Sequence, residues 1–280
     1  MHAPVLRFEY LRILSIAGSD SGGGAGIQAD LKTFAALGCF GTSAVTALTA
    51  QNTLGVRAIH GTPPDMLRQQ IDAVAEDIGV DAVKIGMLHS PDIVLAVAQA
   101  IEHHALPHIV LDPVMVATSG AVLIDQPAIA ALVRHLFGRV ALVTPNLDEA
   151  ALLVGRRLPD EAAMERAGHE LLAMGARAVL LKGGHLAGDS VSDLLVTANG
   201  QAHWMRAQRI VTANTHGTGC TLSSAIASYL ARGCSLVDAV EAARAFVRAA
   251  LTAGADVRTG AGSGPLNHGH APQAMVLRPR

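Results

Sequence analysis

The sequence has no excess of charge of either sign, with 21 Lys and Arg residues against 23 Asp and Glu. A chain this close to neutral lacks the basic surface that attracts nucleic acids or anionic membranes, so we expect neither as a partner. Its three cysteines, Cys39, Cys220 and Cys234, are odd in number and irregularly spaced. They argue against a disulfide framework and favour a reducing compartment.

Long membrane-spanning hydrophobic runs are also missing. Residues 33–56 and 210–231 carry no Asp, Glu, Lys or Arg, but both stretches are interrupted by Gly, Asn, Gln and Thr. Neither stretch therefore predicts a membrane span. The first twelve residues have no apolar core of the kind that secretion signals contain. We expect a soluble, cytoplasmic protein.

The common nucleotide-binding and zinc-binding motifs are absent. No Gly-Lys-Ser or Gly-Lys-Thr occurs, which excludes a P-loop. The two glycine-rich loops fail the dinucleotide pattern, because Ile27 and Leu222 stand where its last glycine belongs. No set of protein-kinase motifs is present. The histidines show no zinc-ligand spacing, so we predict no zinc site.

Segments typical of strands and helices alternate along most of the chain. The expected strands cover residues 13–17, 42–50, 56–60, 82–85, 108–111, 140–143, 178–181, 194–196 and 203–205. The expected helices cover residues 27–37, 63–78, 90–104, 127–137, 147–154, 160–174, 221–232 and 236–253. Most strands are unbroken apolar runs, which predicts an α/β domain with a mainly parallel sheet covered on both faces. Residues 258–280 show little periodicity.

Polar side chains of chemical interest follow the predicted strands. They are Asp20, Gln51, Asp112, Asn146 and Lys182, and Met87 occupies a similar position. Ligands of parallel α/β sheets bind at the carboxyl ends of the strands. The shared placement therefore predicts a single site at that edge.

Gly217-Thr218-Gly219-Cys220 comes just before a predicted helix. The first helical amides have no partner inside the helix, and the helix dipole adds positive charge there. Glycines let an anionic oxygen approach that backbone, so the stretch predicts a site for a phosphate or an oxyanion. Cys220 would lie in the first turn, where its thiol pKa should be lowered. The alternative is a glycine turn that only caps the helix, beside a buried cysteine.

Three charged residues suit phosphate and metal chemistry. Lys182 is one of only three lysines, and it lies at a strand end beside two glycines, as expected of an ammonium that faces phosphate. Asp112 and Glu149 offer the carboxylates that Mg²⁺ prefers. Each also has a simpler interpretation: Lys182 as a solvated loop residue, Asp112 as a turn residue before Pro113, and Glu149 as an acid favoured in a first helical turn.

Several ordered motifs together resemble the hydroxymethylpyrimidine/phosphomethylpyrimidine kinases of thiamine biosynthesis. They are residues 16–20, 23–32, 50–52, 84–88, 111–115, 144–150, Lys182-Gly183-Gly184-His185, residues 215–220 and residues 264–268. The match runs from about residue 12 to residue 270, so we expect one kinase domain over residues 12–270. Residues 1–11 would form an extension and residues 271–280 a tail.

The resemblance implies a ribokinase-like fold, a three-layer αβα sandwich that is usually dimeric. It also implies transfer of the ATP γ-phosphate to the hydroxymethyl group of the pyrimidine, and then phosphorylation of the monophosphate to the diphosphate. Gln51 would be the main pyrimidine-binding residue, in a pocket lined by Gly18, Asp30, Met87 and Val114. Asp112 and Glu149 would serve Mg²⁺, and Asn146, Lys182 and Thr215 would bind the ATP phosphates. The residues of the anion hole would be Gly217, Thr218, Gly219 and Cys220, with Cys220 nearest the substrate hydroxyl.

Two other functions stay open from the sequence. Relatives of this family phosphorylate pyridoxal, whose ring also carries a hydroxymethyl group, so a pyridoxal or pyridoxine kinase is one alternative. A non-catalytic pyrimidine sensor on the same fold is the other. Asp112, Glu149, Lys182 and residues 217–220 argue against the sensor, because a protein that only binds could lose them.

Overall fold

A computed structural model describes residues 7–116, 124–184, 186 and 188–280. Its centre is an eight-stranded sheet in the order β11-β10-β9-β8-β7-β6-β2-β3. The strands are β2 (Arg12–Ala17), β3 (Phe40–Val45), β6 (Ala82–Ile85), β7 (Ile109–Leu111), β8 (Leu142–Val143), β9 (Ala178–Leu181), β10 (Ser190–Thr197) and β11 (Ala202–Gln208). Strands from β9 to β3 run parallel, while β10 and β11 are antiparallel to their neighbours. The expected mainly parallel sheet is confirmed.

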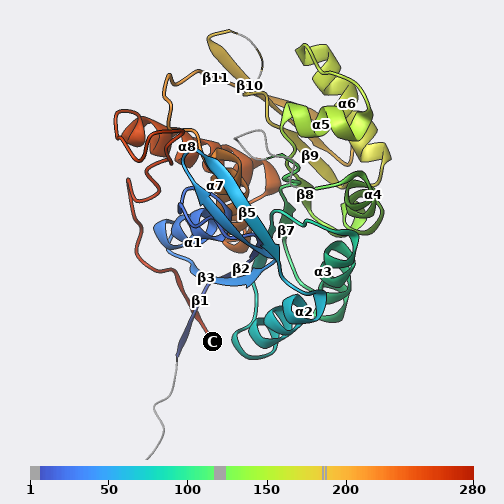
Figure 1. Ribbon diagram of the computed structural model, residues 1–280, viewed down its shortest axis with the longest axis vertical. Coiled ribbons are helices and arrows are strands. Elements are labelled where there is room, and N and C mark those ends of the chain that lie inside the picture. The colour runs from blue at the N-terminus through green and yellow to red at the C-terminus, as the bar shows by residue number, and fades with distance from the viewer. Residues whose placement is uncertain (1–6, 117–123, 185, 187) are drawn as a thin grey trace, which may run out of the picture.

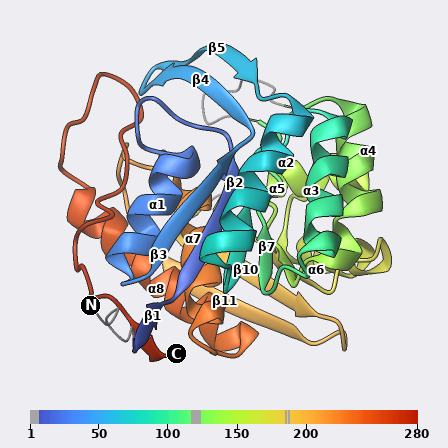
Figure 2. The same ribbon diagram turned by 90° about the horizontal axis from the view of Figure 1, so that it is seen from below.

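Helices cover both faces of this sheet (Figures 1 and 2). One layer contains α1 (Gly26–Ala36), α7 (Thr218–Ala231) and α8 (Leu236–Gly254). The other contains α2 (Pro64–Ala73), α3 (Pro91–His103), α4 (Gln126–His135), α5 (Leu147–Val154) and α6 (Glu161–Ala173). Strand β2 serves both layers, because Ile13 packs into the α1–α7–α8 core while Leu14 and Ile16 pack into the other. The three-layer αβα sandwich is therefore confirmed.

Most helices begin where the sequence provides a cap. Ser90, Asp125, Asn146 and Asp160 each accept a hydrogen bond from a first-turn amide, at the starts of α3, α4, α5 and α6. The helix expected over residues 63–78 continues past α2 as a π-helical turn, η1 (Val74–Ile78). Within the described ranges, we find no helix with the length and apolar composition needed to cross a membrane.

The prediction of a single strand over residues 42–50 is wrong. The chain bends at the buried Thr46, whose amide donates to Ala17 O at 2.9 Å and whose hydroxyl donates to Met87 O at 2.8 Å. Beyond the bend, β4 (Ala47–Asn52) leaves the main sheet and pairs with β5 (Gly55–Gly61) in a separate two-stranded sheet. The bend carries Gln51 out over the edge of the main sheet, as Figure 2 shows for the β4–β5 hairpin.

The two ends of the chain, expected to lie outside the kinase domain, pack together and against it. Strand β1 (Phe8–Tyr10) pairs antiparallel with β12 (Leu277–Pro279). The preceding tail is held by backbone hydrogen bonds from Gln273 N to Ala36 O and from Val276 N to Gly38 O, both 2.8 Å. The lack of periodicity after residue 258 hid this pairing, because a three-residue strand carries no detectable pattern.

Candidate active site

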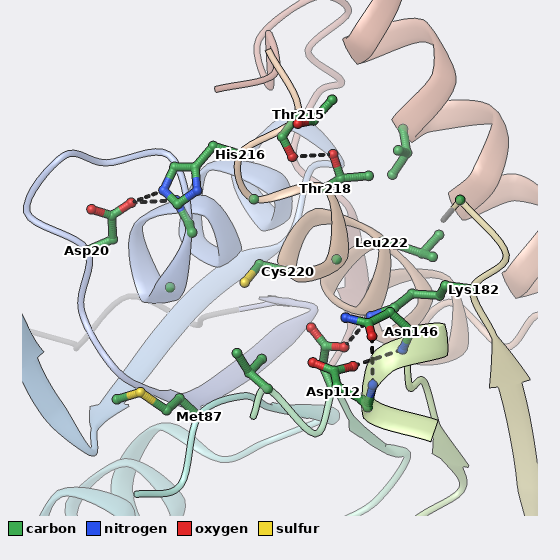
Figure 3. Close-up of a pocket in the computed structure, with 18 of the residues that line it drawn as sticks. Asp20, Met87, Asp112, Asn146, Lys182, Thr215, His216, Thr218, Cys220 and Leu222 are labelled. Atoms are coloured by element: carbon green, nitrogen blue, oxygen red, sulfur yellow. Dashed lines mark hydrogen bonds and ion pairs between the residues drawn. The ribbon is translucent and has the colours of Figure 1, made fainter. Parts of the chain in front are cut away.

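One large cavity, about 770 Å³ in volume, opens at the carboxyl ends of the parallel strands. Its walls come from the loops after β2, β6, β7, β8 and β9, from β4, and from the start of α7 (Figure 3). Every residue predicted for the site lines this cavity except Asp30. The arrangement follows from the parallel sheet, because all its strands point their carboxyl ends to the same edge.

Lys182 and Asp112 form an ion pair at the centre of the cavity. Lys182 Nζ donates to Asp112 Oδ1 at 2.6 Å, and the Thr144 hydroxyl donates to the same oxygen at 3.0 Å. Burial alone would lower the pKa of Lys182, but the Asp112 and Glu149 carboxylates outweigh this effect and hold it above its usual value. Lys182 is therefore a permanent cation, and the solvated-loop interpretation of this residue is wrong.

Glu149 and Asn146 join β8 to α5 through a capping box. Asn146 N donates to Glu149 Oε2 at 2.8 Å, and Glu149 N donates to Asn146 Oδ1 at 2.9 Å. Burial raises the pKa of Glu149 to about 7, aided by the negative charge of Asp112 and opposed by Lys182. A buried carboxyl without full charge compensation, next to a second one, fits a divalent cation held by oxygen ligands.

Helix α7 points its N-terminus at the Lys182–Asp112 pair. It begins at Thr218, earlier than the expected Thr221, and its N-cap Gly217 has φ 84°. A Cβ added at Gly219 would lie 3.1 Å from Lys182 Nζ and 3.4 Å from Asp112 Oδ2, which shows how closely the helix backbone approaches the pair. The N-terminal partial charge and the Lys182 ammonium thus face the same point.

One of the four amides predicted for the anion hole is already engaged within the chain. The Thr218 amide and hydroxyl both donate to Thr215 O, at 3.2 Å and 2.7 Å, so this amide is already engaged. The described chain supplies no acceptor for the amides of Gly217, Gly219 and Cys220. These three amides are the ones available to an anion in the cavity.

The prediction that Cys220 has a lowered pKa is wrong. Burial raises the pKa of its thiol to about 11, although the nearby Lys84 ammonium acts in the opposite direction. The negative charges of Asp30 and Asp112 act in the same direction as burial, and together these effects exceed that of Lys84. At neutral pH Cys220 is a thiol, which carries its own proton.

The prediction that Asp30 lines the pocket is also wrong. Asp30 is fully buried beneath the cavity floor, where Oδ2 accepts from Lys84 Nζ at 2.9 Å and from Ser15 Oγ at 2.6 Å. Its Oδ1 accepts from Ser224 Oγ at 2.7 Å. Lys84, which sequence reasoning missed, is the residue of this group that lines the cavity. The sequence signal was present, since Lys84 is a charged residue inside an otherwise apolar strand.

The pyrimidine-binding residues meet at one end of the cavity. Gly18, Gln51, Met87 and Val114 come from four separate segments and all line it. Gly18 leaves room for Met87, because a Cβ there would lie 2.7 Å from the end of the Met87 side chain and displace it. The Gln51 amide lies within hydrogen-bond distance of Thr49 and of His216, a residue that the sequence analysis left without a role.

The opposite end of the cavity is lined by residues that no motif revealed. Leu222 of α7 and Val247 and Leu251 of α8 supply apolar surface there, and Ile210 faces it from the loop after β11. Arg244 also lines the cavity and pairs with Asp193 at 2.7 Å. An ordinary amphipathic helix pattern does not tell which apolar residues face a cavity. His185, which belonged to the quoted Lys182 motif, lies outside the described residues.

Comparisons with known proteins identify the family. The family model for phosphomethylpyrimidine kinase matches residues 20–267. A hydroxymethylpyrimidine/phosphomethylpyrimidine kinase of Rhizobium meliloti is 50% identical, over 92% of this chain and 96% of the relative. The thiamine biosynthesis bifunctional protein ThiED of Geobacter sulfurreducens is 51% identical over 91% of this chain, which spans only 52% of that longer protein.

Among solved structures, the pyridoxal kinase of Staphylococcus aureus in complex with AMP-PCP and pyridoxal is similar. The TM-score is 0.84 at 33% identity, covering 94% of each chain. The family match extends over most of the chain and includes the strand-end residues that line the cavity. This chain belongs to the phosphomethylpyrimidine kinase family.

Proposed function

We propose that this protein is an ATP-dependent kinase that phosphorylates the hydroxymethyl group of 4-amino-5-hydroxymethyl-2-methylpyrimidine and then converts the monophosphate to the diphosphate. One observation carries the proposal: a single cavity joins the Gln51 end to a helix N-terminus flanked by Lys182 and Asp112. Family membership supports the same reaction. A substrate alcohol is the nucleophile in this chemistry, so no nucleophilic side chain is required.

The pyrimidine occupies the Gln51 end in this proposal, between Met87 and Val114. Both its polar ring edge and the hydroxymethyl group then find partners in the cavity. Gln51 offers a donor and an acceptor to the ring edge, and Cys220 lies close to the hydroxyl. Because buried hydrogen-bonding groups discriminate strongly between ligands, Gln51 sets the preference for an aminopyrimidine.

ATP occupies the opposite end, with its base against Leu222, Val247 and Leu251. Its phosphates extend toward Asn146, Lys182 and Thr215 and reach the free amides of Gly219 and Cys220. Asp112 and Glu149 would hold Mg²⁺, which neutralises charge on the phosphate oxygens when bound. The residues of the chain then orient the two substrates in line and stabilise negative charge on the transferring group.

The proton of the substrate alcohol does not go to a Cys220 thiolate at neutral pH, because the thiol pKa lies near 11. Loose phosphoryl-transfer transition states develop little positive charge on the attacking oxygen, so early proton removal is unnecessary. We therefore assign most of the rate acceleration to Lys182 and the α7 amides. Cys220 orients the hydroxyl.

A second candidate function is pyridoxal phosphorylation, favoured by the likeness to the Staphylococcus aureus pyridoxal kinase. The test is ADP release with ATP and either alcohol, with products identified by mass spectrometry. We expect kcat/KM for the aminopyrimidine to exceed that for pyridoxal. Turnover of pyridoxal alone would overturn the proposal, and tight pyrimidine binding without ADP release would favour the sensor.

The proposal includes a homodimer in the cytoplasm. Apolar side chains on the β4–β5 hairpin support a partner surface, since Leu48, Leu54 and Ile59 are 55%, 66% and 44% exposed. Sedimentation equilibrium of the wild type and of Leu48→Glu tests the dimer. A monomeric wild type would remove it without affecting the proposed reaction.

A further inference from the structure

Asp20 and His216 form a buried pair beside the proposed pyrimidine end of the cavity (Figure 3). His216 Nε2 lies 2.8 Å from Asp20 Oδ2, and the two side chains are 11% and 2% exposed. Asp20 lies in the loop between β2 and α1, whereas His216 precedes the N-cap of α7. The pair thus joins two loops that are 196 residues apart in the chain.

The two loops also fit together without room for extra atoms. A Cβ added at Gly24 would lie 2.5 Å from His216 Cδ2, and a Cβ added at Gly217 would lie 1.8 Å from Gly24 O. Each glycine therefore permits the other loop to approach. The His216 ring lies directly against the Gly24 backbone, so its plane and position are fixed by packing as well as by Asp20.

Asp20 is held in its ionised form by hydrogen bonds to its oxygens. Gly22 N donates to Oδ1 at 2.8 Å, while Gly24 N and Ala25 N donate to Oδ2 at 3.0 Å and 2.8 Å. A carboxylate only accepts hydrogen bonds, so an unprotonated ring nitrogen at 2.8 Å would face it with a repulsive lone pair. Nε2 of His216 must therefore carry a hydrogen.

This protonation state determines how the Gln51 amide is oriented. The nitrogen atoms Gln51 Nε2 and His216 Nε2 lie 3.3 Å apart, and two N–H groups cannot donate to one another. The Thr49 hydroxyl has a single hydrogen, which it donates to Ser19 O at 2.8 Å. Gln51 Oε1 lies 3.2 Å from the same hydroxyl oxygen, so two acceptors face each other there. A half-turn of the amide removes both conflicts. The NH₂ group then donates to the Thr49 oxygen, and Oε1 faces the single Nε2–H of His216, which it shares with Asp20 Oδ2.

We propose that Asp20 and His216 are positioning residues that fix the orientation of the Gln51 amide and so select the ring edge of the substrate. After the half-turn, Gln51 keeps one lone pair and one N–H for a ligand, in a defined order. A ring edge that carries an amino group next to a ring nitrogen supplies the complementary donor and acceptor. The proposal rests on the pyrimidine kinase function proposed above and extends it to the origin of its selectivity.

The first experiment does not depend on turnover. Two-bond ¹H–¹⁵N correlation spectra of ¹⁵N-histidine-labelled protein report which ring nitrogen carries a hydrogen, and the His216→Phe variant assigns the resonances. We expect His216 Nε2 to be protonated at neutral pH in the free protein. A His216 ring with its only hydrogen on Nδ1 would overturn the proposal.

The second experiment separates positioning from packing. His216→Phe keeps a ring against Gly24 but removes the donor, whereas His216→Gln keeps an N–H near the Nε2 position. We expect His216→Phe to lower kcat/KM for the aminopyrimidine by about 5- to 150-fold, the effect of one unpaired buried group, with KM for ATP unchanged. His216→Gln should recover most of this loss. A packing role predicts the reverse order, with His216→Phe the better variant.

An analogue lacking the amino group, 5-hydroxymethyl-2-methylpyrimidine, tests selectivity directly. The wild type should discriminate against it, and His216→Phe should discriminate far less, because the amide is no longer held in one orientation. Equal discrimination by both proteins would overturn the proposal. His103→Phe, on the exposed end of α3 away from the cavity, is the matched control and should behave as wild type.

Failure of this inference and of the proposed function give different results. A wild type that turns over neither pyrimidine would refute the proposed function, while the histidine spectrum would still report the state of the pair. A wild type that turns over the aminopyrimidine, with His216→Phe unaffected, would refute only the role of the pair.

Discussion

Asn146 and Glu149 exchange hydrogen bonds of 2.8 Å and 2.9 Å across the first turn of α5, so the expected magnesium-binding acid is also part of a helix cap. The cap holds the Glu149 carboxylate where it interacts electrostatically with Lys182 and Asp112. A structural and a functional role therefore coincide in one side chain. Substitutions that differ in charge but not in hydrogen bonding can separate the two.

Glu149→Gln should keep the cap and remove the charge, because glutamine also serves in a capping box. We expect its free energy of unfolding to stay within about 1 kcal/mol of wild type. The Mg²⁺ concentration for half-maximal activity should rise. Glu149→Ala should lose the cap as well, so its unfolding midpoint should lie at a lower urea concentration. An unchanged Mg²⁺ titration for Glu149→Gln would remove this residue from the metal site.

The two glycines around the start of α7 should respond oppositely to alanine. Gly217 has φ 84°, and a Cβ there would lie 1.8 Å from Gly24 O, so Gly217→Ala should destabilise the fold. Gly219 lies within the helix, where alanine is favoured by about 1 kcal/mol. Its added Cβ would instead reach 3.1 Å from Lys182 Nζ. Gly219→Ala should therefore melt no lower than wild type yet lose kcat, as thermal unfolding and steady-state kinetics will show.

If Gly219→Ala retains wild-type kcat, the approach of α7 to Lys182 has no role in transfer. If Gly219→Ala is destabilised as much as Gly217→Ala, Gly219 does not occupy a helical position in which alanine is favoured.

The position of the site could be predicted from the sequence because it depends on short local patterns. Each apolar strand ends in a polar residue, and a parallel sheet gathers such residues at one edge. Asp112, Asn146 and Lys182 were found in this way. Gln51 was found for a partly wrong reason, since its strand is not the continuous one expected. It reaches the cavity because Thr46 bends the chain.

Contacts between distant segments could not be predicted in the same way. Asp20 pairs with His216 across 196 residues, and Asp30 pairs with Lys84 across 54. The periodicity of apolar residues along the chain does not indicate such pairs. The direction of the Cys220 pKa shift does not follow from its place at a helix start, because burial and the nearby Asp30 and Asp112 carboxylates raise it. Desolvation depends on the packed fold, which a local motif does not contain.

His268 should make the fold sensitive to acid. Burial lowers its pKa to about 4, and its Nε2 lies 3.0 Å from the Thr221 hydroxyl, behind the start of α7. Since the folded state binds this proton less tightly than the unfolded state, stability should fall as pH drops from about 6.5 to about 4. The loss amounts to about 3 kcal/mol at most.

His268→Gln keeps an amide near the Thr221 hydroxyl and does not titrate in this range. Urea unfolding between pH 4 and pH 7 should give a flatter pH dependence for this variant than for wild type. Parallel curves for the two proteins would show that His268 does not contribute to the acid sensitivity.

Cys220 provides the last prediction, because the structure reverses the expectation drawn from its helix position. With a thiol pKa of about 11, the thiolate is a minor species throughout the neutral range. A thiolate base would give kcat an acid limb that Cys220→Ser lacks. We expect no such limb, so kcat should depend on pH in the same way for wild type, Cys220→Ser and Cys220→Ala between pH 6 and pH 9. The kcat of Cys220→Ala should also fall by less than the roughly 10²–10⁴-fold that removal of a general base typically costs.

The alkylation of Cys220 by iodoacetamide can be followed by peptide mass spectrometry. Its rate should increase with pH up to about 11 in the free enzyme. Rapid alkylation that is already maximal at pH 7, together with an acid limb lost in Cys220→Ser, would restore the thiolate base and refute the assignment of the rate to Lys182 and the α7 amides.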